Sequence, residues 1–168
     1  MAYYFQLAGT QAESAMEQMI AQLKSKAKQS LKTTSDDDII VRPLRPEDVG
    51  LSTPEWTFNI ASANAWNLNQ LNTTIADNRW IGINGILYAM SSTQAVTQLK
   101  VKRAGQNKRY WQVQGINFLE NASIFFSDPV IIEENTNLTV DMYAIATGST
   151  EKIIFLGAVV EKKGILTR

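Results

Sequence analysis

The sequence contains no histidine and no cysteine. The chain therefore has no Ser-His-Asp triad, no thiol nucleophile, and no zinc site built from histidine or cysteine ligands. It also has no disulfide framework. These absences exclude the enzymes that work through imidazole or thiolate groups, and we predict no catalytic residue, no metal site and no cofactor.

Charge is also scarce, because Asp, Glu, Lys and Arg make up 19% of the chain, against about a quarter of an average protein. The 16 basic and 16 acidic residues cancel to a formal net charge of zero. A neutral balance disfavours a protein whose whole surface grips nucleic acid or an acidic membrane. It also allows copies of the chain to approach one another without net repulsion.

Long apolar runs are absent as well. No run approaches the roughly 18 residues that a membrane-spanning helix needs, so we predict no membrane span. The opening residues, MAYYFQLAG, lack a basic segment followed by a sustained apolar one. We therefore expect no signal peptide.

One segment, residues 10 to 32, has clear helical periodicity. It opens with Thr10-Gln11-Ala12-Glu13, which fits a capping box, and its apolar residues then recur at spacings of three and four. Three interpretations stay open. The helix packs on its own sheet, or it is an arm whose apolar stripe contacts a neighbouring subunit, or its lysines contact nucleic acid or a membrane surface. The stripe consists of Met16, Met19, Ile20 and Leu23.

The rest of the chain predicts one sandwich domain behind a linker. We divide the sequence into an N-terminal helical arm (1–34), a linker with an entry strand (35–54) and a β-sandwich domain (55–168). The linker combines three consecutive aspartates, 36–38, with prolines that interrupt regular structure. Its composition separates the helical pattern from the strand pattern.

Period-two alternation dominates from residue 55 onward. In the segment 137–147, for example, Leu138, Val140 and Met142 alternate with polar residues. Glycines at 82 and 85 interrupt another strand, which indicates a bulge or a close approach of a neighbouring backbone. Eight or nine such strands match an antiparallel β-sandwich or barrel. We predict the sandwich, with an N-terminal amphipathic α-helix, and the resemblance described below implies that it is jelly-roll-like with about eight strands.

Five cations lie on the two arms of a predicted hairpin whose turn is 104–107. Tyr110 and Trp111 stand beside them, and basic residues interleaved with rings are typical of single-stranded nucleic-acid contacts. The alternative, which we favour, is a charged hairpin that discourages edge-to-edge strand pairing. The cations are Lys100, Lys102, Arg103, Lys108 and Arg109.

The chain has four tryptophans. Trp56 and Trp80 lie in apolar strand patterns, so we predict that both are buried. Trp66 lies among asparagines, and an exposed ring there would be a candidate ligand platform, for example for sugar rings.

Carboxylate chemistry is the enzymatic route that these absences leave open, since a glycosidase needs two suitably spaced acids. None of the candidate acids sits in a recognisable catalytic motif, so we predict that the protein is not an enzyme. The candidates are Glu120, Asp128, Glu133, Glu134 and Asp141.

The C-terminal two thirds of the chain resembles the single jelly-roll proteins of viral and phage particles. The segments that carry the resemblance are WIGINGI (80–86), FSDPVII (126–132) and IFLGAVVE (154–161). A lysine-bearing helical arm, a polar hinge and then a sandwich is also an arrangement similar to theirs. The resemblance implies a place in a virion, with an arm that ties subunits together or faces the packaged genome.

Together these observations predict a structural self-assembly protein, namely a capsid, decoration or other virion component. Its expected partners are further copies of itself and other particle proteins. The first alternative is a carbohydrate- or receptor-binding module, and the second is a nucleic-acid-contacting protein. If the protein is not viral, we expect a soluble one.

Overall fold

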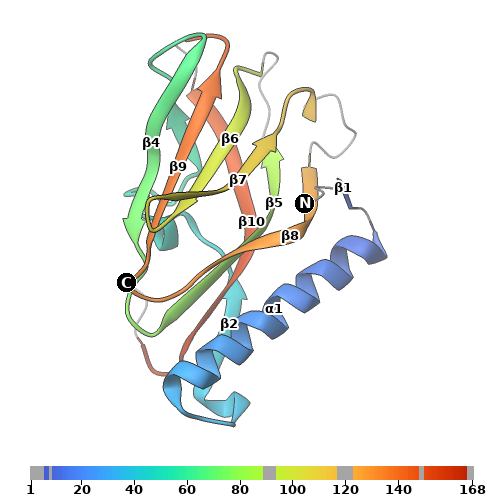
Figure 1. The fold of residues 1–168 in the computed structure, drawn as a ribbon, viewed down its shortest axis with the longest axis vertical. Helices are drawn as coiled ribbons and strands as arrows, with labels where there is room; N and C mark the ends of the chain where they lie inside the picture. Colours follow the sequence, from blue (N-terminus) through green and yellow to red (C-terminus); the bar gives the residue numbers. More distant parts are fainter. Residues whose placement is uncertain (1–5, 8, 89–93, 117–122, 148–149, 166–168) are drawn as a thin grey trace.

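The computed structural model describes residues 6–7, 9–88, 94–116, 123–147 and 150–165. They form two antiparallel sheets, stacked as a sandwich, and one long helix (Figure 1). The predicted mainly β sandwich with an N-terminal helix is therefore confirmed.

The first sheet has the strand order β1-β8-β5-β10-β2, and β3 pairs with the N-terminal end of β10, whereas β2 pairs with its C-terminal end. These strands are β1 (Gln6–Leu7), β2 (Ile39–Pro43), β3 (Thr57–Asn59), β5 (Arg79–Tyr88), β8 (Ser123–Ile132) and β10 (Thr150–Lys162). The second sheet has the order β4-β9-β6-β7. Its strands are β4 (Ala65–Thr74), β6 (Val96–Arg103), β7 (Gln106–Gln112) and β9 (Asn137–Ala144). The helix α1 (Thr10–Leu31) precedes two short 3-10 turns, η1 (Asp36–Asp38) and η2 (Pro46–Val49).

The strand pairs are nested along the chain, as in a jelly roll. The hairpin β6–β7 is innermost, and the antiparallel pairs β5–β8, β4–β9 and β2–β10 enclose it in turn. The four nested pairs together form one long two-stranded ribbon. Because successive pairs belong to alternate sheets, this ribbon is rolled into two four-stranded layers, and β1 and β3 are added to the first. This is the eight-stranded jelly-roll arrangement.

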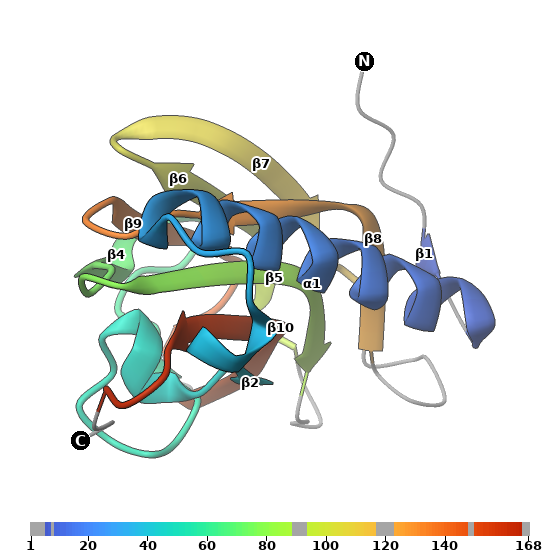
Figure 2. The same cartoon turned by 90° about the horizontal axis from the view of Figure 1, so that it is seen from below.

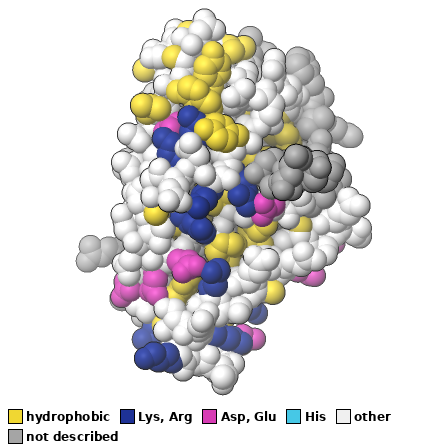
Figure 3. Space-filling view, viewed as in Figure 1, with side chains coloured by type: hydrophobic (Ala, Val, Ile, Leu, Met, Phe, Trp, Pro, Cys, Tyr) yellow, Lys and Arg dark blue, Asp and Glu magenta, His cyan; other side chains and the backbone are white. Residues whose placement is uncertain are grey.

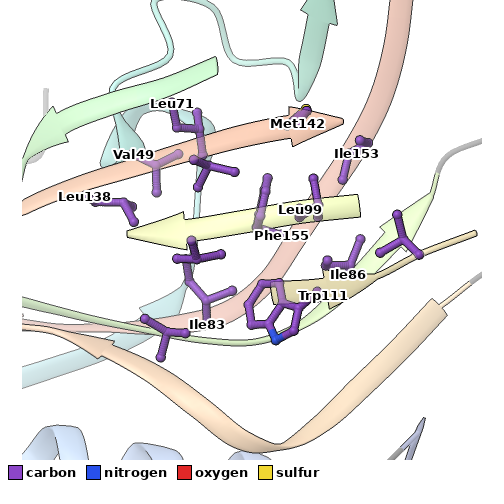
Figure 4. Packing of buried hydrophobic residues seen from close by; sticks show 14 of the residues in the cluster. Val49, Leu71, Ile83, Ile86, Leu99, Trp111, Leu138, Met142, Ile153 and Phe155 are labelled. Carbon is purple, nitrogen blue, oxygen red and sulfur yellow. The ribbon is translucent and has the colours of Figure 1, made fainter. Parts of the chain in front are cut away.

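The main core lies between the two sheets (Figure 4). The alternating residues predicted for segment 137–147 point into it: Leu138, Val140 and Met142 are fully buried. Trp111 of β7 stacks on Phe126 of β8, with ring centroids 4.6 Å apart, and so joins the two layers. Period-two alternation buries one side of each strand, which explains why this core could be anticipated.

Helix α1 covers the outer face of the first sheet, where it forms a second core (Figures 1 and 2). Met19 and Leu23 are fully buried against Trp80 of β5 and its neighbours. Gly82 makes this close approach possible, because a Cβ there would stand 2.7 Å from the Met19 sulfur and 3.0 Å from Leu23 Cδ1. The second core also contains Ala27, Ile39, Ile131, Ala158 and Val160.

This packing places two of the four residues of the predicted apolar stripe out of reach of a neighbouring subunit. Met19 and Leu23 have no exposed surface left for a neighbour, and Met16 and Ile20 pack partly against the same core. The helix of the predicted N-terminal arm (1–34) therefore lies on the sheet of its own chain, which was one of the interpretations left open. The physical reason is that the outer face of β5, β8 and β10 is itself apolar and needs a cover.

The ends of α1 differ in part from the sequence prediction. Residue Gly9, with φ of 55°, precedes the first turn, and no side chain caps the helix there. The capping box expected at Thr10 is therefore wrong, because Thr10 is already helical. At the other end, Lys28 hydrogen-bonds to Asp36 at 2.7 Å, and this contact lowers the pKa of that carboxyl. Within the described ranges, no helix combines the length and the apolar character that crossing a membrane requires.

A buried polar pair lies at one end of the main core. The hydroxyl of Tyr88 hydrogen-bonds to the carboxylate of Glu151, and both residues are almost completely buried. Burial, helped by the negative neighbour, raises the pKa of Tyr88 above its usual value. The backbone N–H of Val96 also donates to the hydroxyl oxygen, at 3.4 Å.

We expect Tyr88→Phe to lower the free energy of unfolding by about 1–3 kcal/mol, because it deletes a buried hydrogen-bond partner. The folded-state pKa of Tyr88 is raised, so its stabilisation holds below about pH 10 and is lost as the unfolded tyrosine ionises above it. Urea titrations should show that the difference in free energy of unfolding between the unmodified chain and Tyr88→Phe shrinks above about pH 10. Tyr110→Phe, on an exposed ring, is the control. An unchanged midpoint in Tyr88→Phe would contradict this account.

Candidate functional site

The outer face of the second sheet gathers three aromatic rings around one lysine. Trp66 of β4 and Tyr143 of β9 are paired across the strands, with ring centroids 5.5 Å apart. Tyr110 of β7 lies 6.4 Å from Trp66, on the far side of Lys100. The Lys100 ammonium stands 4.1 Å from the centre of the Trp66 ring and 5.3 Å from that of Tyr110. These distances fit cation–π contacts.

Exposed apolar side chains extend this cluster. Leu68 follows Trp66 on β4 and is 61% exposed, Tyr110 is 51% exposed, and Ile145, two residues after Tyr143, is 50% exposed. Leu68 and Trp66 share one side of β4 because they are two residues apart in a strand, whereas Ile145 lies in a bend just past the end of β9. Figure 3 shows hydrophobic side chains gathered over β4 and β9 with Lys or Arg beside them. We call Trp66, Leu68, Lys100, Tyr110, Tyr143 and Ile145 the aromatic–lysine face.

The structure thus brings together two residues that the sequence suggested for separate roles. Trp66 was a candidate ligand platform, and Lys100 was one of five cations in a candidate nucleic-acid contact. They meet because β4 and β6 both pair with β9 and point these side chains outward. However, Trp66 is half-buried, and Lys100 covers one face of its ring. It is therefore not a flat, free platform for a sugar ring.

Lys102 forms an ion pair with a buried acid. Its ammonium lies 2.5 Å from a carboxylate oxygen of Asp141, which is fully buried. The other oxygen of Asp141 accepts a hydrogen bond from the backbone N–H of Asn69 at 2.9 Å. Asn69 has φ of 56°, inside a β-bulge of β4. This contact fixes the bulge and leaves Lys102 with a structural role.

The two arginines of the hairpin reach across to the first sheet. Arg103 donates to the backbone carbonyl of Ile131 at 2.8 Å, and Arg109 forms an ion pair with Asp128. Both acceptors lie on β8, so the arginines tie the β6–β7 hairpin to a strand near the edge of the first sheet. Lys108, the fifth predicted cation, is half-buried and hydrogen-bonds Gln106 at 3.3 Å. The five cations therefore do not form one basic patch.

The candidate acids that the structure describes are also separated from one another, because each contacts a different partner. Besides Asp128 and Asp141, Glu133 forms an ion pair with Lys26 of α1 at 2.5 Å. Glu134 accepts a hydrogen bond from the backbone N–H of Asn78 at 2.7 Å and another from a helix serine. Glu120 lies outside the described residues. Each of the four described acids is engaged by a partner of its own.

Sequence reasoning missed Leu68, Tyr143 and Ile145, and it noted Tyr110 only beside the cations. A signal for Tyr143 was present, because Leu138, Val140 and Met142 face inward and the residues between them must face outward. What the pattern lacks is the register between strands. Strands far apart in sequence supply Trp66, Lys100 and Tyr143, and only their pairing places these residues together.

Comparison of the chain with protein-family models and with curated proteins finds no match.

Proposed function

We propose that this protein is a structural subunit that assembles with copies of itself through the aromatic–lysine face. The observation that carries the proposal is the exposure of Leu68 and Tyr110 on the second sheet and of Ile145 just past the end of β9. Large apolar side chains that cluster on a surface typically mark a contact with another protein. Tyr110 lies on β7, whereas Leu68 stands beside the bulge of β4 and Ile145 lies just past the end of β9.

The charge and the architecture support an assembly role. The formal net charge of zero leaves little general repulsion between copies. The second core under α1 is complete within one chain, so each copy is a self-contained building block. The particle in which it works is, in this proposal, a virus or phage particle, as the resemblance to single jelly-roll capsid and decoration proteins implies. Jelly rolls also occur in lectins, so the fold by itself does not support the assignment to a virus or phage particle.

Two alternatives are less well supported by the same surface. A nucleic-acid contact requires free cations that follow a backbone, whereas Lys102, Arg103 and Arg109 are engaged within the chain. A carbohydrate platform requires an open ring face, whereas Lys100 covers one face of Trp66. Tyr110 is half-exposed and would be the ring to test.

The strength of one such contact can be bounded. Burying the exposed halves of three large side chains contributes on the order of 3 kcal/mol, taking about 1.5–3 kcal/mol for complete burial of each. Association also costs several kcal/mol of lost translational and rotational freedom. A single contact is therefore weak, and assembly depends on each copy making more than one.

The test is the molar mass of the full chain by size-exclusion light scattering over a range of concentrations. We expect the molar mass to rise with concentration. This rise should be lost in the double variant Leu68→Ser/Tyr110→Ser, because the contact surface of that variant has lost two large apolar side chains. Ile40→Ser is the matched control, since Ile40 is 40% exposed on β2, away from the face. A full chain that stays monomeric, or a rise that persists in the double variant, would refute the proposal.

A further inference from the structure

A groove on the side of the sandwich opposite the aromatic–lysine face is apolar and has an acidic rim, so it complements that face in charge. It runs between the N-terminal half of α1 and β8, with a volume of about 540 Å³. Its apolar wall comes from Met16, Ala12 and the ring of Phe125, and its rim carries two glutamates, Glu13 and Glu17. We call Ala12, Glu13, Met16, Glu17 and Phe125 the acidic groove.

The two glutamates are exposed and stand one helical turn apart. Carboxylates at positions i and i+4 repel each other, while Glu13, in the first turn of α1, also interacts favourably with the positive end of the helix dipole. Neither glutamate has an ion-pair partner among the described residues, whereas Lys24, Lys26 and Lys28 on the same helix pair with acids. The negative charge at this rim is therefore available to a cation from outside the chain.

Lys100 on the aromatic–lysine face is the matching cation. Its ammonium contacts two rings, and it has no acidic partner among the described side chains. Tyr110 lies beside it, and Leu68 and Ile145 are the other exposed apolar side chains of the face. These apolar side chains match the apolar wall of the groove. Each surface thus combines an apolar area with one sign of charge, and the signs are opposite.

We propose that assembly is head to tail: the aromatic–lysine face of one copy docks into the acidic groove of the next. This inference rests on the proposed function and names the partner surface. The face is on the outer side of the second sheet, and the groove is at the helix that covers the outer side of the first. One copy therefore engages two neighbours at once, and the contact is heterologous, so copies build a ring or an open row rather than a two-fold dimer.

Charge reversal tests the pairing. Lys100→Glu would place acid against acid, and Glu13→Lys/Glu17→Lys would place base against base. We expect each variant alone to associate at least about tenfold more weakly than the unmodified chain, because like charges meet at the contact. Mixed in equal amounts, the two variants should associate again, since each face then meets a groove of opposite charge. The readout is molar mass by light scattering, with circular dichroism to verify that both variants are folded.

Matched controls carry the same charge changes elsewhere. Lys152→Glu controls for Lys100→Glu, and Glu47→Lys/Glu55→Lys controls for the groove variant, because all three residues are exposed. The groove substitutions lie on the exposed side of the helix and remain informative even if Lys100→Glu fails to fold. Association that resists Glu13→Lys/Glu17→Lys, or no recovery on mixing two folded variants, would overturn the head-to-tail contact while leaving self-assembly intact. A full chain that never associates would overturn both.

Discussion

Removal of residues 1–34 is expected to leave a chain that cannot hold a stable fold, instead of a smaller folded domain. The deletion takes away Met19, Leu23 and Ala27, and it uncovers Trp80, Ile131 and Val160 on the first sheet. Burial of these side chains contributes on the order of 10 kcal/mol before the cost of ordering the helix, at about 1.5–3 kcal/mol for each large one. That is comparable to the whole stability of a typical domain, about 5–15 kcal/mol.

Near-ultraviolet circular dichroism and thermal melting of the truncated chain provide the measurement. Leu23→Ala is a milder version that keeps the helix, and we expect it to cost about 2–5 kcal/mol, as fully buried leucines do. Ile20→Ala is its control on the same helix, where the side chain is partly exposed and the loss should be smaller. If the truncated chain melts cooperatively at the temperature of the full chain, α1 is not part of the core.

The second large effect is expected from Arg42→Ala. Arg42 of β2 makes two hydrogen bonds to Asp48, of 2.6 and 2.7 Å, and two to Glu161, of 3.1 and 3.2 Å. Arg79 contacts the same two acids at 3.4 and 3.2 Å. Both carboxylates are nearly buried, and the bonds from Arg42, those to Asp48 above all, raise the pKa of the guanidinium.

Without Arg42, two buried carboxylates would share the single charge of Arg79. Breaking a buried ion pair by removing one partner typically costs about 3–5 kcal/mol, and we expect a loss in that range at neutral pH. Denaturant unfolding of Arg42→Ala beside Lys152→Ala, which removes an exposed charge, separates the network from a general charge effect. Equal unfolding midpoints for the two variants would show that the network contributes little.

Much of the fold was open to prediction from local patterns. The strands β5, β9 and β10, the hairpin β6–β7 and the burial of Trp80 follow from alternation, apolar runs and turn residues. The glycines of β5 were assigned a bulge or a close approach, and both occur: the pairing register with β8 shifts between Ile83 and Gly85, and Gly82 lies against the helix. These features depend on residues near one another in sequence, which is why they could be predicted.

The candidate site was harder to predict from the sequence than the fold. Trp66 and Lys100 were each identified, but for different functions, because nothing in either segment reveals that β4 and β6 flank β9. The dispersal of the five cations was hidden for the same reason. Arg103 and Arg109 point to β8, while Lys102 points to Asp141. Whether a charge is free or engaged depends on partners that are remote in sequence.

By itself, the sequence determined the chemical limits of this protein and its local structure. The lack of histidine and cysteine, the balanced charge, the helical period of α1 and the period-two strands depend only on residue types and short spacings. The tertiary structure alone decided that Met19 and Leu23 of the α1 stripe are buried on the sheet of their own chain, and that three rings and a lysine share one face. Both outcomes depend on which strands pair and in what register, and the long-range contacts that set them leave no local pattern.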